Sequence, residues 1–463
     1  MGPRIKLFQT ERQEPPKTLH MVLEDMQSAM LEIEASAAEN PNIAPVNTPQ
    51  EEALLEVVIA REEQELEAIT EVVDSSLPAI GALEDTAYGI APAIQSARPT
   101  DIALVRQVAN TAADALGVPT EELLVGVDDS NIGQPLVLEG FKEKARAAAR
   151  AVWVAIANIF DRMWTLFQAN FSRIGGKLKK LHGVVRQLES GAVDATVRVS
   201  ASMNALTATG TLDAASVLEQ QKNSLAYNKF ANIVLGSPEK LYSRIASKVT
   251  KPGKADEIEE AFKDTVTELI GAYADIAFGS SVFETSGDDY RTKFPINGDF
   301  VILKNLAKAN GLIKSDPLAA AAEFNNVSIA TEGGGLKLPE TVDYTAENFR
   351  SVATATGKIF STLTPGMISH TQGLVRMAKR DVSVLGDKVT NHWTQLLDAE
   401  KPEVQNQLRP FVSAVGQLVN KHASLTSAIY ARSMSSIAAE LTAVTMLLEQ
   451  GVKGKTDDKK EEK

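Results

Sequence analysis

The sequence predicts an all-α protein, built from several long amphipathic helices that pack in bundles and are joined by irregular connectors. Of its 463 residues 44% are hydrophobic but only 5% are aromatic, so the apolar content is mainly Ala, Val, Leu and Ile. Alanine and leucine are strong helix formers. Apolar residues recur at three- and four-residue intervals along most of the chain, which is the period of a helix with one buried face.

Residues 1–47 predict an N-terminal arm that carries one helix and could be removed as a propeptide. Pro15 and Pro16 interrupt regular structure near the start. Apolar residues at helical spacing then predict a helix over 20–38, which ends in the Asn- and Pro-rich linker 40–49.

Residues 48–137 predict an acidic helical region. Thr48 has the features of an N-cap, Pro49 suits the first helical position, and Glu51 completes a capping box. A second, shorter helix is expected to end at Gly117. An irregular connector follows it.

Residues 138–190 predict a basic aromatic helical segment. Its apolar face has a 3.6-residue period and includes Trp153 and Trp164. The pair Gly175–Gly176 is expected to break or hinge the helix. Cations flank the apolar face on both sides: Lys142, Lys144, Arg146 and Arg150 come before it, and Arg173, Lys177, Lys179 and Lys180 come after it.

The remaining chain predicts a helical middle domain over 191–330, a linker over 331–345, a C-terminal helical bundle over 346–452 and a disordered charged tail over 453–463. Within the middle domain, Ser237, Pro238 and Glu239 resemble the start of a helix. The polar, turn-rich stretch 280–302 is a candidate for a short hairpin.

Charge is distributed unevenly. Residues 1–100 hold 18 Asp and Glu against 6 Lys and Arg, whereas residues 141–188 hold 10 Lys and Arg against 2 Asp and Glu. The first region therefore carries about all of the net charge of −13, and the second is strongly basic. One interpretation is two solvated faces of opposite sign. Another is an acidic region that masks the basic segment.

No reaction is indicated by the motifs. The chain has no cysteine, so disulfides and thiolate metal sites are excluded. Its five histidines are scattered singly, and phosphate-binding loops, nucleophile elbows and zinc-protease motifs do not occur. We therefore expect no catalytic residues, no metal and no cofactor. No long uncharged apolar run occurs either, which predicts a soluble protein without a transmembrane helix.

Three interpretations of the basic aromatic segment remain open. Trp and Phe side chains often dominate a core, which favours a buried central helix. A broad apolar face with Trp and flanking cations also suits a helix lying in a membrane surface. Clustered cations suit double-stranded DNA, because phosphate attraction is independent of base sequence.

The segment that begins LEGFKEKARAAARAVWVAIANIFDRMWTLF and continues into KLKKLHGVVRQLESG resembles the internal head proteins of large tailed bacteriophages. The Ala- and Ser-rich stretch NKHASLTSAIYARSMSSIAAELTAV is similar to their C-terminal regions. The resemblance covers residues 138–190 and 410–450. It implies a helical virion protein that is made in the host cytoplasm, packed inside the capsid with DNA and other virion proteins, in some cases ejected, and trimmed by a prohead protease.

Such proteases cut after glutamate in a small-residue context in some phages, so the resemblance implies cleavage after Glu39 or Glu332. Each is the last residue of a matching triplet, Ala37-Ala38-Glu39 or Ala330-Thr331-Glu332. The leading hypothesis is thus a non-enzymatic structural protein of the phage head interior. The alternatives are a membrane-active or pore-forming helical protein and a helical scaffold.

Overall fold

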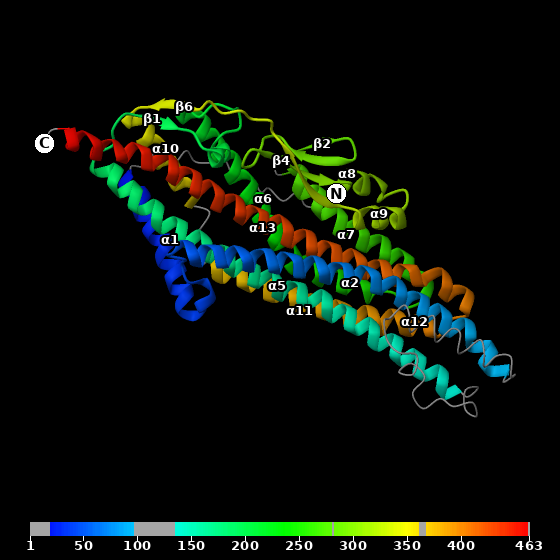
Figure 1. Ribbon diagram of the computed structural model, residues 1–463. Coiled ribbons are helices and arrows are strands. Elements are labelled where there is room, and N and C mark those ends of the chain that lie inside the picture. The colour runs from blue at the N-terminus through cyan, green and yellow to red at the C-terminus, as the bar shows by residue number, and fades with distance from the viewer. Residues whose placement is uncertain (1–18, 97–134, 280–281, 361–366, 462–463) are drawn as a thin grey trace.

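The computed structural model describes residues 19–96, 135–279, 282–360 and 367–461. It confirms the all-α fold class: long helices dominate, and the strands form only two small antiparallel sheets (Figure 1). The helices are α1 (Leu19–Glu39), α2 (Pro49–Ser96), α5 (Pro135–Ser190), α6 (Ala214–Val249), α7 (Ile258–Gly279), α8 (Leu306–Leu312), α9 (Pro317–Asn325), α10 (Ala346–Phe360), α11 (Met367–Lys388), α12 (Thr394–Asp398) and α13 (Pro402–Glu461).

The middle region carries more strand than the sequence predicts. A four-stranded antiparallel sheet has the order β2-β3-β4-β5, and its β2–β3 hairpin is the one that the turn-rich stretch indicated. A second sheet pairs β1 with β6. The strands are β1 (Ala195–Arg198), β2 (Phe283–Ser286), β3 (Asp289–Thr292), β4 (Asp299–Lys304), β5 (Ser328–Gly333) and β6 (Thr341–Tyr344).

The strands also occupy both ends of the expected linker. β5 extends to Gly333 and β6 begins at Thr341, so only 334–340 connects them. The expected disordered tail differs as well, because α13 continues to Glu461. Lys and Glu are good helix formers, and a helix already begun in the core can extend through them. The helix expected to end at Gly117 lies outside the described residues.

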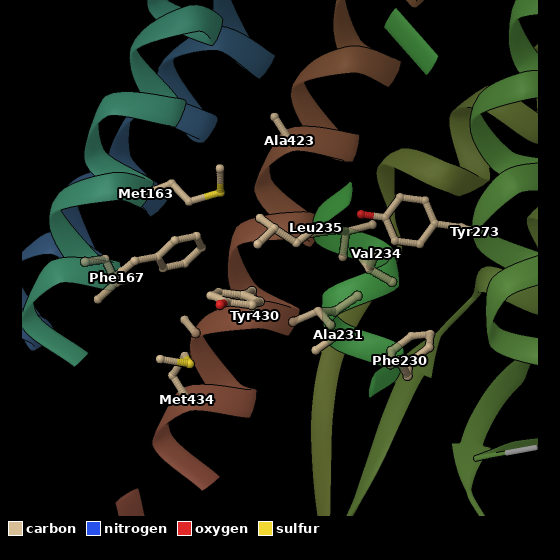
Figure 2. Packing of buried hydrophobic residues seen from close by; sticks show 14 of the residues in the cluster. Met163, Phe167, Phe230, Ala231, Val234, Leu235, Tyr273, Ala423, Tyr430 and Met434 are labelled. Atoms are coloured by element: carbon tan, nitrogen blue, oxygen red, sulfur yellow. The ribbon is translucent and has the colours of Figure 1, made fainter. Parts of the chain in front are cut away.

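Helices α2, α5 and α13 run side by side along the length of the molecule (Figure 1). α13 is the central one: it also packs on α6, α7, α9 and α10, and the buried apolar side chains of all these helices form one core. Figure 2 shows Met163 and Phe167 of α5 turned toward Tyr430 and Met434 of α13. The ring centroids of Phe167 and Tyr430 are 4.4 Å apart.

The start of α2 confirms the predicted capping box. The backbone N–H of Glu51 donates to the Thr48 hydroxyl at 3.2 Å, and the backbone N–H of Thr48 donates to Oε2 of Glu51 at 2.9 Å. These bonds satisfy two donors that a helix start leaves free. They also hold the pKa of the Glu51 carboxyl below its usual range, with the Asn47 backbone N–H as the largest cause.

The prediction of a break at Gly175–Gly176 is wrong, because α5 passes through both residues. Their small size serves a close approach. The connector between α1 and α2 crosses α5 here: a Cβ on Gly176 would overlap the Val46 carbonyl oxygen, and one on Gly175 would lie 3.4 Å from Pro45. The Gly175 Cβ would also lie 3.1 Å from Ile33 of α1. The Ser172 hydroxyl donates to the Ala44 carbonyl at the same crossing.

The prediction of a helix start at Ser237–Pro238 is also wrong, since Pro238 lies inside α6. Proline lacks the N–H that would bond to the carbonyl four residues earlier, which is Val234. The Ser237 hydroxyl donates to that carbonyl at 2.8 Å, so the carbonyl keeps a partner and the helix continues.

The core around α13 contains buried polar side chains. The Tyr242 hydroxyl and Nδ1 of His422 lie 2.8 Å apart, and the Tyr273 hydroxyl lies 2.6 Å from Oγ1 of Thr426. Glu440 is fully buried. Burial raises the pKa of its carboxyl to about 8, and the Ser224 hydroxyl only partly opposes this. Glu440 is therefore held mainly as the neutral acid at pH 7.

Candidate functional site

The contact between α2 and α5 joins the acidic and basic segments of the chain. Nη1 of Arg162 lies 2.7 Å from Oε2 of Glu65 and 3.4 Å from Oε2 of Glu62. Further along α5, Nη2 of Arg173 lies 3.1 Å from Oε1 of Glu56. As the residue numbers rise on α5 they fall on α2, so the two helices are antiparallel.

These ion pairs form a ladder between α2 and α5, and the ladder continues to the start of α2. Nζ of Lys177 lies 2.6 Å from Oε1 of Glu52, and Lys179 donates to the side-chain oxygen of Asn47 at 2.9 Å. The hydrogen bond from Lys177 is the largest cause that lowers the pKa of the Glu52 carboxyl. Lys180 turns the other way, and its Nζ lies 3.4 Å from Oε1 of Glu449 on α13. Each of the four predicted cations from Arg173 to Lys180 thus has a polar partner within the chain.

The ion pairs between α2 and α5 contribute less to stability than the buried apolar side chains do. A partly exposed ion pair contributes about 0.2–1 kcal/mol. Burying an aromatic side chain contributes about 1.5–3 kcal/mol, and Phe160, Phe167 and Phe171 are all buried. Apolar packing therefore contributes most of the stability of this contact, and the ion pairs favour the register that brings opposite charges together.

The aromatic face of α5 lies inside the bundle. Trp153 is 6% exposed and packs directly on Gly386 of α11. Trp164 is half-buried at the edge of the core. The buried central helix is thus the interpretation that this conformation realises, and the face that would enter a membrane is occupied by other helices. Among the described helices, none combines the length and the hydrophobicity that a membrane span requires.

The cations before the aromatic face differ from those after it. Arg150 is exposed and donates to the side-chain oxygen of Asn391 at 3.2 Å. Lys142, Lys144 and Arg146 belong to α5, but their side chains lie outside the described part of the structure.

The two predicted cleavage positions lie in ordered backbone. Glu39 is exposed at the end of α1, and the N–H of the next residue, Asn40, donates to the Ser36 carbonyl at 2.8 Å. Glu332 is exposed on β5, an edge strand, and Oε2 lies 3.0 Å from Nη2 of Arg291. Cleavage at either position would require local opening. Cleavage after Glu39 would detach α1 but leave α2 on α5.

A cleft of about 600 Å³ lies between α1 and α5. Burial, followed by the charge of Arg186, lowers the pKa of its His182 imidazole. His20 lies 3.5 Å from Glu24 and 3.9 Å from Glu189. Within the described ranges no group of three or more His, Asp or Glu side chains could hold a metal ion. The cleft is lined by His20, Leu23, Glu24, Gln27, Met30, Leu31, Glu34, His182, Arg186 and Glu189.

The partners of the α5 cations could not be chosen from the sequence. The net charges of the two segments indicated attraction, but Glu52, Glu56, Glu62 and Glu65 become candidates only once the register of α2 against α5 is known. Comparison of the chain with protein-family models, with curated proteins and with solved structures found no match.

Proposed function

We propose that this protein is a non-enzymatic structural protein of a phage virion, located in the head interior beside other virion proteins, whose basic helix α5 can bind double-stranded DNA. The proposal combines the resemblance in residues 138–190 and 410–450 with one observation. Of the four cations of α5 that follow the aromatic face, Arg173 and Lys177 pair with carboxylates of α2, so this part of α5 is masked.

In this proposal α2 competes with DNA for α5. Both present a row of negative charges, and each cation that moves from a carboxylate to a phosphate releases a DNA counterion. The aromatic face need not leave the core, because Arg173 and Lys177 lie on the side of α5 that faces α2. Trimming after Glu39 by a prohead protease would remove α1, which packs against α5. Without α1, the ion pairs between α2 and α5 would separate more readily.

The test is binding of the full-length protein to a labelled 30-base-pair duplex, measured by fluorescence anisotropy at several salt concentrations. The double variant Glu52→Gln, Glu56→Gln removes the two carboxylates that pair with Lys177 and Arg173, and it makes the net charge more positive by two. We expect tighter binding than by the unaltered protein, and a plot of log affinity against log salt steeper by about 2.

The matched control is Glu67→Gln, Glu71→Gln, which makes the same charge change on exposed positions of α2. An equal increase in DNA affinity for both double variants would show that only net charge matters. It would refute the proposal that α2 masks α5. No binding by any of the three proteins would favour the second candidate, a helical scaffold. That candidate is supported by the same observation, since the four cations already have partners within the chain.

The membrane-active alternative requires α5 to leave the core, because Trp153 and the phenylalanines are buried. Movement of Trp fluorescence to the blue with liposomes would be a weak test, since Trp153 is already in an apolar environment. Leakage of a dye from anionic vesicles is a sharper one, because it requires the apolar face to enter the bilayer.

A further inference from the structure

The side of α2 that faces away from the bundle carries an apolar stripe in solvent. Leu54, Val57 and Val72 are 69%, 66% and 60% exposed, and Ala68 is exposed between them. Of the ten most exposed large hydrophobic residues in the described ranges, four lie on this one helix. Figure 1 shows α2 on the outside of the bundle.

The stripe has the spacing of a helix–helix seam. Positions 54, 57, 61, 64, 68 and 72 follow one another at intervals of three or four residues, so they share one face of α2. Two such stripes can pack against each other as in a coiled coil. The two central positions are polar, Arg61 and Gln64, and both are exposed.

The order of side chains along the stripe is symmetric about its centre. Leu54 and Val72 are the outer pair, Val57 and Ala68 come next, and Arg61 and Gln64 are innermost. The two numbers of each pair add to 125 or 126. An antiparallel second copy of α2 with its two-fold axis near position 63 therefore places apolar against apolar at both ends.

The charges favour the same arrangement. Nε of Arg61 lies 2.7 Å from Oε1 of Glu65 in its own helix. In the antiparallel arrangement Arg61 lies opposite Gln64 and beside Glu65 of the second copy, so the guanidinium again meets an oxygen acceptor. A parallel arrangement in the same register would set Arg61 against Arg61, which is repulsive.

We propose that the outer stripe of α2, positions 54–72, is a self-association surface on which a second copy of this chain docks antiparallel. The stripe is about 27 Å long, at 1.5 Å per residue, and one helix wide. Such a contact buries less than the roughly 1,200 Å² that marks the lower end of stable interfaces, so the dimer belongs to the weak, reversible class.

Disulfide trapping tests the register directly, because the chain has no cysteine of its own. Leu54→Cys and Val72→Cys are made separately in the full-length protein and oxidised, alone and as an equal mixture. We expect a covalent dimer from the mixture and little from either variant alone. Dimers formed by each variant alone would show parallel pairing, and no dimer in any sample would show that this face does not pair; either result overturns the proposal.

Sedimentation equilibrium of the protein without cysteines tests the surface independently of cross-linking. Val57→Glu places a charge in the stripe and is expected to weaken association at least tenfold. Val154→Glu is the matched control, since Val154 is 59% exposed but lies on α5. Equal association constants for both variants would refute the surface, and far-UV circular dichroism checks that both remain folded.

Discussion

Replacing Glu440 by Gln should stabilise the protein relative to the unaltered chain, by a difference that grows as the pH rises. Glutamine keeps the size of the side chain but cannot ionise. Burial raises the pKa of the Glu440 carboxyl from 4.5 to about 8 in the folded protein, and no Lys or Arg of the described residues contributes an opposite charge. Ionisation of this carboxyl in the unfolded chain therefore lowers the stability of the fold at every pH above about 4.5.

The sign and the pH window follow from proton linkage. Below pH 4.5 the carboxyl is protonated in both the folded and the unfolded state, so its ionisation does not lower the stability of the fold. Between 4.5 and about 8 the unfolded chain releases the proton while the folded chain retains it, so stability falls as pH rises. Above about pH 8 the carboxyl is ionised in both states, so stability no longer falls with pH and the loss stays at its full value.

The magnitude is the width of that window multiplied by about 1.4 kcal/mol per pH unit, or roughly 5 kcal/mol across it and about 3 kcal/mol at pH 7. The assay is urea unfolding of the unaltered protein and the Glu440→Gln variant at pH 5, 7 and 8.5, followed by far-UV circular dichroism. The gap between the two midpoints should widen with pH, by on the order of 1 M urea.

Glu449→Gln is the control, because Glu449 lies on the same helix but forms an ion pair with Lys180 at the surface. Its midpoint should not separate progressively from that of the unaltered protein as pH rises. If the gap for Glu440→Gln were the same at pH 5 and pH 8.5, Glu440 would not be held as a neutral acid and the reasoning would fail.

Three further changes test the packing. Gly386→Ala would place a Cβ 2.5 Å from Cγ of Trp153, and the overpacking should lower stability by about 1–3 kcal/mol, measured as a fall in the urea midpoint. Gly176→Ala would displace the Val46 backbone, so limited proteolysis should cut the 40–48 connector faster than in the unaltered protein; an unchanged cleavage rate would contradict the close crossing. Burial lowers the pKa of the His422 imidazole to about 3, so its neutral form stabilises the fold above pH 6.5 and that contribution is lost as pH falls toward 3. His422→Gln should be less stable at pH 7, with a gap that narrows on acidification in urea melts, whereas a constant gap would show that the imidazole charges within the folded protein.

Local chemistry is what the sequence by itself determined. Helical periodicity and the scarcity of aromatic side chains gave the all-α class, and Thr48 with Glu51 gave the start of α2, because a capping box involves only neighbours in the chain. The apolar face of α5 was also recognisable. It follows from a 3.6-residue period that any partner helix would have to cover.

The tertiary structure decided everything that depends on which segments meet. Gly175 and Gly176 looked like a break because glycine is a poor helix former, yet their purpose is to let residues 45 and 46 cross α5. Pro238 looked like a helix start, and a serine one position earlier allows the helix to continue. In both places the local preference costs about 1–3 kcal/mol, which long-range packing exceeds.

The binding partners of the α5 cations could likewise be identified only from the tertiary structure. Their sign and clustering are visible in the sequence, and so is the excess of carboxylates upstream. Whether a cation meets DNA, a membrane or a carboxylate depends on what lies within a few ångströms of it. That is fixed by the antiparallel register of α2 against α5, in which Lys177 meets Glu52 and Arg173 meets Glu56.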